Sequence, residues 1–201
     1  MLFASQFLDW AFWRTRLNRA MKIALLSDLH IDADPSQVAH GQNMADNLRR
    51  TVEEVIAEAP DAVFVTGDIA YQYGEPAAYQ TAEQLLEPIR AAGITLLQLV
   101  GNHDNAEHMH QPSDQLERIS DYDVDFIVTN TQTELKAVRG KLGGHQLEFL
   151  ESHAAADDTP IVILGHHNPE FPRKDFKDKI GIEDTDEFVA LLDYSPNIKK
   201  F

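Results

Sequence analysis

The sequence predicts a single α/β domain in which parallel strands alternate with helices that pack on the sheet. Three observations carry this prediction. Short apolar segments of strand length recur along the 201 residues, and longer segments with apolar residues at helical spacing lie between them. Polar residues of one chemical kind follow directly after the apolar segments. The alternating order is typical of a largely parallel sheet, whose ligands sit at the carboxyl ends of its strands.

The first half contains three expected strands, at 22–27, 62–67 and 94–100. A helix is expected at 43–59, between the first two strands, because its apolar residues recur at helical spacing. These residues are Met44, Leu48, Val52, Val55, Ile56 and Ala59.

A second helix is expected at 75–93. Pro76 falls in its first turn and Gly93 ends it, as is common at the two ends of helices. Pro88 predicts a kink or a break near Leu86, because proline removes a helical hydrogen bond.

The second half predicts further strands at 123–130, 134–140 and 159–165, a short helix at 143–155 and a loop at 169–180. A last helix, 184–194, has Asp184 or Thr185 as its expected cap. The final segment, 197–201, is expected to be the first half of another strand.

Residues 1–20 are expected to be separate from the domain at 21–201. They hold aromatic residues followed by Arg14, Arg16 and Arg19, which is the reverse of the order in a secretory signal. They are either an upstream extension, which we favour because Met21 is a natural domain start, or an amphipathic arm on a membrane surface or a partner.

The composition excludes several classes of protein. The formal charge of −16 disfavours nucleic acid and anionic membranes as partners. No apolar run is long enough to span a membrane. The sequence has no cysteine, which excludes disulfides and thiolate metal sites and fits a reducing compartment such as the cytoplasm.

Carboxylates, an amide and imidazoles follow four of the apolar strands. In chain order these residues are Asp28, His30, Asp68, Asn102, His103, Asp104, His166 and His167. The first two are expected on one side of an extended chain. Because neighbouring strand ends lie about 5 Å apart, the whole set is expected to converge in one small volume.

Such a cluster has the chemistry of a metal site. Buried carboxylates are costly unless a cation compensates them, and oxygen with imidazole but no sulfur suits Mn, Fe or Zn. A central carboxylate can bridge two metals about 3.5–4 Å apart, the arrangement that hydrolyses phosphate esters. Gly67 and Gly101 would let backbone approach the cluster. Capping of strand ends explains any one of the residues but not all of them together.

These motifs, in this order and each after a strand, resemble the calcineurin-like metallophosphoesterase superfamily. The resemblance covers residues 21–201 and implies a layered α-β-β-α sandwich. A closer resemblance is to the branch that contains bacterial cyclic-AMP phosphodiesterases. It rests on the segments 67–89, 100–105, 144–151 and 163–169.

The resemblance implies a pair of divalent metals and a role for each residue. Asp28 and His30 would bind the first metal, Asp68 would bridge both, and Asn102 and His166 would bind the second. A hydroxide bridging the metals would attack the phosphorus in line.

The resemblance implies that His103 and Asp104 act on the substrate and do not bind metal. In the family the histidine equivalent to His103 donates a proton to the leaving oxygen, and Asp104 would hydrogen-bond His103 and fix its orientation. His166 is preferred over His167 as the ligand, because the family pattern His-His-Pro-Pro, here His-His-Asn-Pro, uses its first histidine.

The sequence departs from the family in one motif. Gly-His-x-His, which completes the shell of each metal, is missing, and the sequence ends at Phe201 about where that motif would begin. We therefore expect a sandwich that is incomplete at the C-terminus, in a truncated chain whose own activity is in doubt.

The expected function is metal-dependent hydrolysis of a small phosphorylated substrate, most often a phosphodiester such as a cyclic nucleotide. One alternative is a non-catalytic interaction scaffold of the same fold. Another is a phosphomonoesterase, including a phosphoprotein phosphatase.

Overall fold

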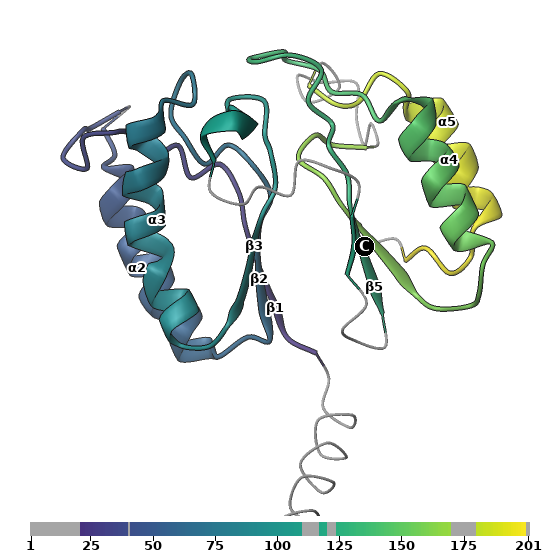
Figure 1. Ribbon diagram of the computed structural model, residues 1–201, viewed down its shortest axis with the longest axis horizontal. Coiled ribbons are helices and arrows are strands. Elements are labelled where there is room, and N and C mark those ends of the chain that lie inside the picture. Colours follow the sequence, from purple (N-terminus) through teal and green to yellow (C-terminus); the bar gives the residue numbers. More distant parts are fainter. Residues whose placement is uncertain (1–20, 40, 110–116, 120–123, 170–179, 200–201) are drawn as a thin grey trace, which may run out of the picture.

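The computed structural model describes residues 21–39, 41–109, 117–119, 124–169 and 180–199. They form two three-stranded sheets that lie face to face, with a pair of helices outside each sheet (Figure 1). The α-β-β-α layering expected from the resemblance is confirmed. The expected extension or arm at 1–20, and most of the loop expected at 169–180, lie outside the described residues.

The first sheet consists of β1 (Ile23–Leu26), β2 (Ala62–Val65) and β3 (Thr95–Gln98), all parallel and in that order. Helices α2 (Met44–Glu58) and α3 (Pro76–Ala91) cover its outer face (Figure 1). All five elements were predicted.

Helix α2 begins where the side chain of Asn43 accepts a hydrogen bond from the Asp46 N–H, which satisfies one of the free donors of the first turn. The apolar stripe of Leu48, Val52 and Val55 is buried against the sheet, as the helical spacing predicts.

Helix α3 has Pro76 at its first position and runs through Pro88 without a break. The sequence predicted a kink or a break near Leu86; the helix is continuous there, so a break does not occur. Leu86 and Ile89 are both fully buried on the two sides of the proline, and this packing holds the last turn although it lacks one hydrogen bond. Gly93, with φ of 75°, follows the end of the helix as predicted.

The second sheet consists of β4 (Glu117–Ile119), β5 (Asp125–Val128) and β6 (Ile161–Leu164). Strand β4 is antiparallel to β5, and β5 is parallel to β6. Helices α4 (Gly143–Ala154) and α5 (Thr185–Tyr194) lie on its outer face (Figure 1).

In this half one strand was missed and one prediction is wrong. Strand β4 was not expected, and the strand expected at 134–140 is a series of turns and bends. Lys136 has φ of 64°, which interrupts an extended chain, and its N–H donates to the carbonyl of Asn102 rather than to a strand.

Asp184 stands at the capping position of α5, but its side chain makes no capping bond there. Its carboxylate instead accepts the N–H groups of Leu142 and Gly143, where α4 begins. The expected cap thus serves the neighbouring helix and joins the two.

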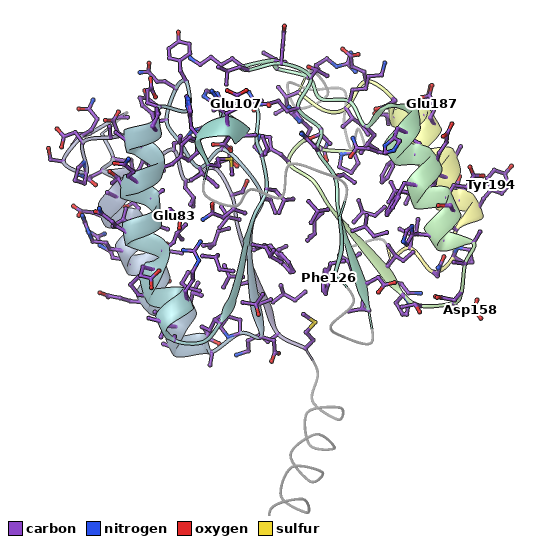
Figure 2. All side chains as sticks on the ribbon, in the orientation of Figure 1. Glu83, Glu107, Phe126, Asp158, Glu187 and Tyr194 are labelled. Atoms are coloured by element: carbon purple, nitrogen blue, oxygen red, sulfur yellow. The ribbon has the colours of Figure 1, made fainter. Side chains whose placement is uncertain are left out.

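The two sheets are held together by an apolar layer of aromatic and aliphatic residues. It contains Phe64 of β2 and Phe126 of β5, whose ring centroids are 5.1 Å apart. Phe126 is labelled in Figure 2. Burial of each ring stabilises the fold by about 1.5–3 kcal/mol. This layer brings the carboxyl end of β6 beside those of the first sheet.

The segment expected as a final strand pairs with the free edge of β6. Ile198 forms a parallel bridge with Ile161, whose N–H donates to Asn197 and whose carbonyl accepts from Lys199. None of the helices in the described part of the chain combines the length and the apolar character needed to cross a membrane.

Candidate metal centre

The predicted site residues converge where β1, β2, β3 and β6 end. Among the described residues there are two groups of three side chains in which the ligand atoms all lie within 4.8 Å of one another. One contains His30, Asp68 and His103; the other contains Asp28, Asp68 and His166. Asp68 belongs to both groups, as expected for a bridging carboxylate, whereas Asp28 reaches toward His166 as well as His30.

Three of these residues have backbone conformations that the sequence did not predict. Asp28, His30 and Asp68 have φ values of 55°, 45° and 54°, in the left-handed region that residues with a Cβ rarely adopt. The expected extended alternation of Asp28 and His30 is therefore wrong. Such strain persists only where the surroundings impose it, and it is concentrated at functional sites.

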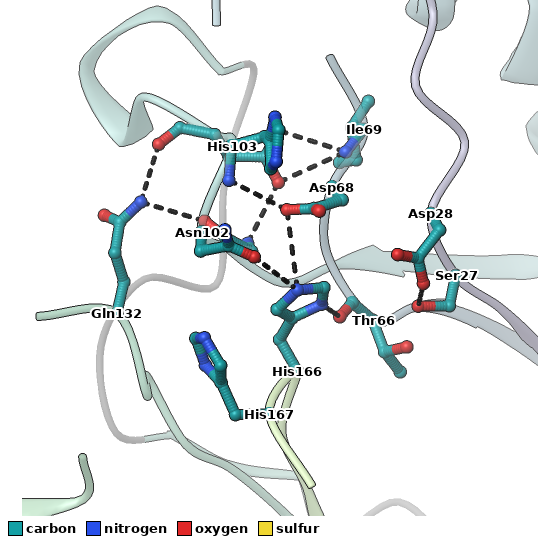
Figure 3. A network of polar contacts seen from close by, with 12 residues as sticks. Ser27, Asp28, Thr66, Asp68, Ile69, Asn102, His103, Gln132, His166 and His167 are labelled. Atoms are coloured by element: carbon teal, nitrogen blue, oxygen red, sulfur yellow. Dashed lines mark hydrogen bonds and ion pairs between the residues drawn. The ribbon is translucent and has the colours of Figure 1, made fainter. Parts of the chain in front are cut away.

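Asp68 lies at the centre of the cluster, and its side chain is 4% exposed. One carboxylate oxygen, Oδ2, is 3.7 Å from His30 Nε2, and the other, Oδ1, is 3.5 Å from His166 Nε2. Oδ1 also accepts the N–H of His103 at 2.8 Å (Figure 3). Each oxygen thus faces one half of the site.

His166 is oriented by the backbone of β2's end. Its Nδ1 donates to the carbonyl oxygen of Thr66 at 2.9 Å, since a carbonyl can only accept (Figure 3). Nε2 is left facing the Asn102 Oδ1 at 3.1 Å and Asp68. The Nε2 lone pair of the neutral ring then faces these oxygens, an arrangement that a cation between them would satisfy.

His167 is turned away from this cluster. Its Nδ1 is 2.7 Å from the Thr131 hydroxyl, and its ring meets that of His166 edge-on at 5.0 Å. Burial, and then the neighbouring His166, lower the pKa of His167 to about 4. This placement favours His166 over His167 as the ligand.

His103 turns its ring toward the metal groups. The ring meets that of His30 edge-on at 5.1 Å, and its Nδ1 is buried without a hydrogen-bond partner among the described residues. The geometry alone is compatible with a proton donor or with a ligand.

Asp104 does not make the hydrogen bond to the His103 ring that was expected. Its buried carboxylate accepts hydrogen bonds from four other donors, the N–H groups of Ile69, Ala70 and Gly101 and the hydroxyl of Tyr79. Burial raises the pKa of Asp104, and the three backbone bonds oppose that rise. Asp104 therefore holds backbone rather than an imidazole.

The two glycines let backbone segments meet as predicted. A Cβ on Gly67 would lie 2.6 Å from Gly101 Cα, and one on Gly101 would lie 2.3 Å from Asp68 Oδ1. Gly67 also has φ of 107°. Side chains at these positions would push the loops after β2 and β3 apart.

The sequence analysis missed two residues that hydrogen-bond to the loops or side chains around the candidate ligands. The Gln132 amide donates to the carbonyls of Gly101 and Asp104, each at 2.8 Å, and so ties the second sheet to the loop after β3 (Figure 3). Tyr79 was missed as well. Neither residue stands at a strand end, so the motif spacing offered no signal.

The residues present fit divalent cations. His30 Nε2 is 3.7 Å from Asp28 Oδ1 and from Asp68 Oδ2. These separations are too long for hydrogen bonds, but they suit atoms that each lie about 2.0–2.2 Å from a shared ion. The donor set of carboxylate, amide oxygen and imidazole without sulfur matches Mn, Fe or Zn.

The comparison with known families agrees with this geometry. The family model described as calcineurin-like phosphoesterase matches residues 21–198. The chain belongs to this family. A phosphoesterase hydrolyses phosphate esters, so the enzyme class expected from the sequence is confirmed at the level of the family.

Curated relatives of this phosphoesterase include cyclic nucleotide phosphodiesterases. It is 31% identical over 180 residues to the 3',5'-cyclic adenosine monophosphate phosphodiesterase CpdA of Pseudomonas aeruginosa, an alignment covering 87% of this chain and 65% of the relative. It is 24% identical over 183 residues to a probable cyclic nucleotide phosphodiesterase of Synechococcus sp., covering 89% and 70%. The chain thus spans about two thirds of these relatives' length.

Solved structures support the fold. A dimetal phosphatase from Danio rerio matches with a TM-score of 0.64 at 13% identity, covering 89% of this chain and 79% of that one. A purple acid phosphatase from yellow lupin matches with a TM-score of 0.52 at 20% identity, covering 75% and 31%. At these identities the likeness shows the fold alone.

Proposed function

We propose that this phosphoesterase hydrolyses phosphodiesters, with cyclic nucleotides as the substrate class. The observation that carries the proposal is the position of Asp68, whose two carboxylate oxygens face different histidines across one buried centre. A carboxylate that serves two groups of ligands is what a dinuclear phosphoesterase site requires.

The ligands proposed for two cations are Asp28, His30, Asp68, Asn102 and His166. When bound, the cations would supply Lewis acidity and lower the pKa of water at the site. The protein's part is to hold the ligands in place. Thr66 fixes the tautomer of His166, and Asp68 fixes the backbone of His103.

His103 is the proposed proton donor to the leaving oxygen. Its backbone is anchored to Asp68 and its ring faces the ligand groups, so a proton on the imidazole lies beside the centre. General acid catalysis of this kind is worth about 10²–10⁴-fold in rate.

The cyclic-nucleotide class is supported by the names of the two relatives, cyclic nucleotide phosphodiesterases that are 24% and 31% identical to this chain. The absence of cysteine supports a reducing compartment, and the cytoplasm stays a prediction.

The test uses the 201-residue chain loaded with Mn²⁺. Turnover is measured on cyclic AMP, on bis-p-nitrophenyl phosphate and on p-nitrophenyl phosphate, before and after removal of the metal with a chelator. We expect kcat/KM for cyclic AMP to exceed that for the monoester at least about tenfold, and activity to return when Mn²⁺ is restored.

Two outcomes would overturn the proposal. A preference for the monoester would make the protein a phosphomonoesterase. Tight Mn²⁺ binding without turnover of any ester, both by this chain and by a version extended with a Gly-His-x-His segment, would favour the scaffold alternative.

A further inference from the structure

Tyr79 reaches the metal centre from α3, one layer outside the ligands. Its side chain is buried, with 3% of the residue exposed. The hydroxyl donates to Asp104 Oδ1 at 3.1 Å and accepts the N–H of Asn105 at 2.7 Å. We propose that Tyr79 is a positioning residue of the metal centre, which acts through Asp104 on the loops that carry Asp68 and Asn102. This inference rests on the proposed function of that centre.

The direction of the Tyr79 hydrogen bonds is determined by their partners. The Asn105 N–H can only donate, so the hydroxyl oxygen accepts there and its single proton goes to Asp104. Asp104 is 1% exposed, and Tyr79 is the one side-chain donor to it among the described residues. A hydrogen bond to a buried carboxylate is stronger than one between neutral groups.

Asp104 connects Tyr79 to the two loops that carry Asp68 and Asn102. Its Oδ1 accepts from Ile69 and Ala70, at 3.0 and 3.1 Å, directly after Asp68 in the chain. Its Oδ2 accepts from Gly101 at 2.9 Å, directly before Asn102. One carboxylate therefore joins the loop after β2 to the loop after β3.

The loop after β2 needs such a constraint, because Asp68 has φ of 54°. A residue with a Cβ stays in this region only where its surroundings impose it. The hydrogen bonds that Asp104 accepts from the N–H groups of Ile69 and Ala70 help to hold Asp68 in this conformation. Loss of the Tyr79 hydroxyl would let the carboxylate turn and let Asp68 relax away from its bridging position.

The fold makes room for the hydroxyl at a glycine. Gly74 has φ of 64°, and a Cβ there would lie 2.7 Å from Tyr79 Oη and 2.6 Å from the Asn105 nitrogen. The close approach of α3's side chain to the loop after β3 therefore depends on the glycine.

The test compares Tyr79→Phe with the wild-type 201-residue chain. Mn²⁺ affinity is measured by isothermal titration calorimetry at a temperature where circular dichroism shows both to be folded. We expect the Mn²⁺ affinity to fall about tenfold and kcat on bis-p-nitrophenyl phosphate to fall by a similar factor, with KM within about twofold.

Tyr194→Phe is the matched control, because Tyr194 lies on α5 with 88% of the residue exposed (Figure 2). It should change neither quantity. Asp104→Asn should weaken Mn²⁺ binding by itself, and adding Tyr79→Phe to it should cost little more if Tyr79 acts through Asp104.

Each outcome decides the matter. Mn²⁺ affinity and kcat within about twofold of wild type, with only a lower melting temperature, would make Tyr79 merely structural and overturn the inference. Additive losses in the double variant would also overturn it. A chain that binds Mn²⁺ but hydrolyses nothing, even when extended with a Gly-His-x-His segment, sinks the proposed function, while the affinity comparison still tests Tyr79. If Tyr79→Phe does not fold, Gly74→Ala displaces the same hydroxyl, and the same weakening of Mn²⁺ binding is expected.

Discussion

The metal centre has a closed side and an open side. The closed side consists of the loops after β2 and β3, residues 66–70 and 101–105, where Asp68 is 4% exposed and backbone and side-chain hydrogen bonds surround it. The open side is the loop after β1, residues 27–30, where the Asp28 side chain is 58% exposed and receives a bond from its neighbour Ser27. Preorganised ligands lose less entropy on binding, so the closed side should hold its cation more tightly.

Asp68→Asn tests the residue that serves both sides, and its effect should be the largest. The amide keeps an oxygen that can accept the N–H of His103 but removes the shared negative charge. We expect Mn²⁺ binding to weaken at both sites and the rate to fall at least about 10³-fold, measured by calorimetry and by turnover of bis-p-nitrophenyl phosphate.

Asp158→Asn is the control for this change, since Asp158 is exposed in the turn before β6 (Figure 2). It should leave binding and rate unchanged. If Asp68→Asn still bound two Mn²⁺ ions with wild-type affinity, the bridging role would be wrong.

His103→Ala separates chemistry from binding on the closed side. We expect a rate loss of about 10²–10³-fold, because the proton donor is gone. The Mn²⁺ stoichiometry from calorimetry should stay the same. A lost Mn²⁺ ion would instead make His103 a ligand, which its position near His30 and Asp68 also permits.

Asp28→Asn tests the open side and should have a smaller effect. We expect one Mn²⁺ ion to bind about tenfold more weakly and the rate to fall about 10–100-fold, while the ion on the closed side keeps its affinity. An equal loss of affinity for both Mn²⁺ ions would show that the two sides do not bind metal independently.

The smallest effect concerns His167, which lies behind the closed side. Its pKa is about 4 when folded, against an ordinary 6.5, so between these values the unfolded chain binds a proton that the folded chain does not. The metal-free protein should therefore lose stability as pH falls from about 6.5 to about 4. Allowing for solvent screening of the ring, we expect about 1 kcal/mol between pH 7 and pH 5.

Urea unfolding of the chelated protein at the two pH values measures this loss, with His167→Gln as the comparison. The variant lacks the titrating ring, so its stability should change less with pH. An identical dependence in both proteins would mean that His167 is not held neutral by the fold.

The sequence predicted most of the fold because, within each segment, the spacing of the apolar residues and the residue types indicated the same element. The helical spacing of Leu48, Val52 and Val55 predicted α2, and the apolar runs predicted five of the six strands found in the described part of the chain. It failed where a single backbone angle decided the outcome. The apolar alternation at 134–140 looked like a strand, but Lys136 turns the chain through a left-handed conformation.

The sequence predicted which residues gather at the candidate site, but not which partners each of them contacts. Residues at the carboxyl ends of parallel strands were expected to lie near one another, so the gathering of the cluster was predicted from position. The choice of Asp28, His30, Asp68, Asn102 and His166 as ligands came from the family resemblance. The partners of Asp104 could not be predicted, because its donors at Ile69 and Tyr79 lie 35 and 25 residues away.

The sequence by itself determined which side chains follow the ends of the strands, because the apolar segments and the residues after them can be read locally. Only the tertiary structure decided which oxygen of Asp68 faces which histidine, that His167 turns away, and that Tyr79 of α3 supports the loops. Those outcomes depend on distances between segments far apart in the chain. Such distances are set by the packing of two sheets and their helices together, which no local pattern encodes.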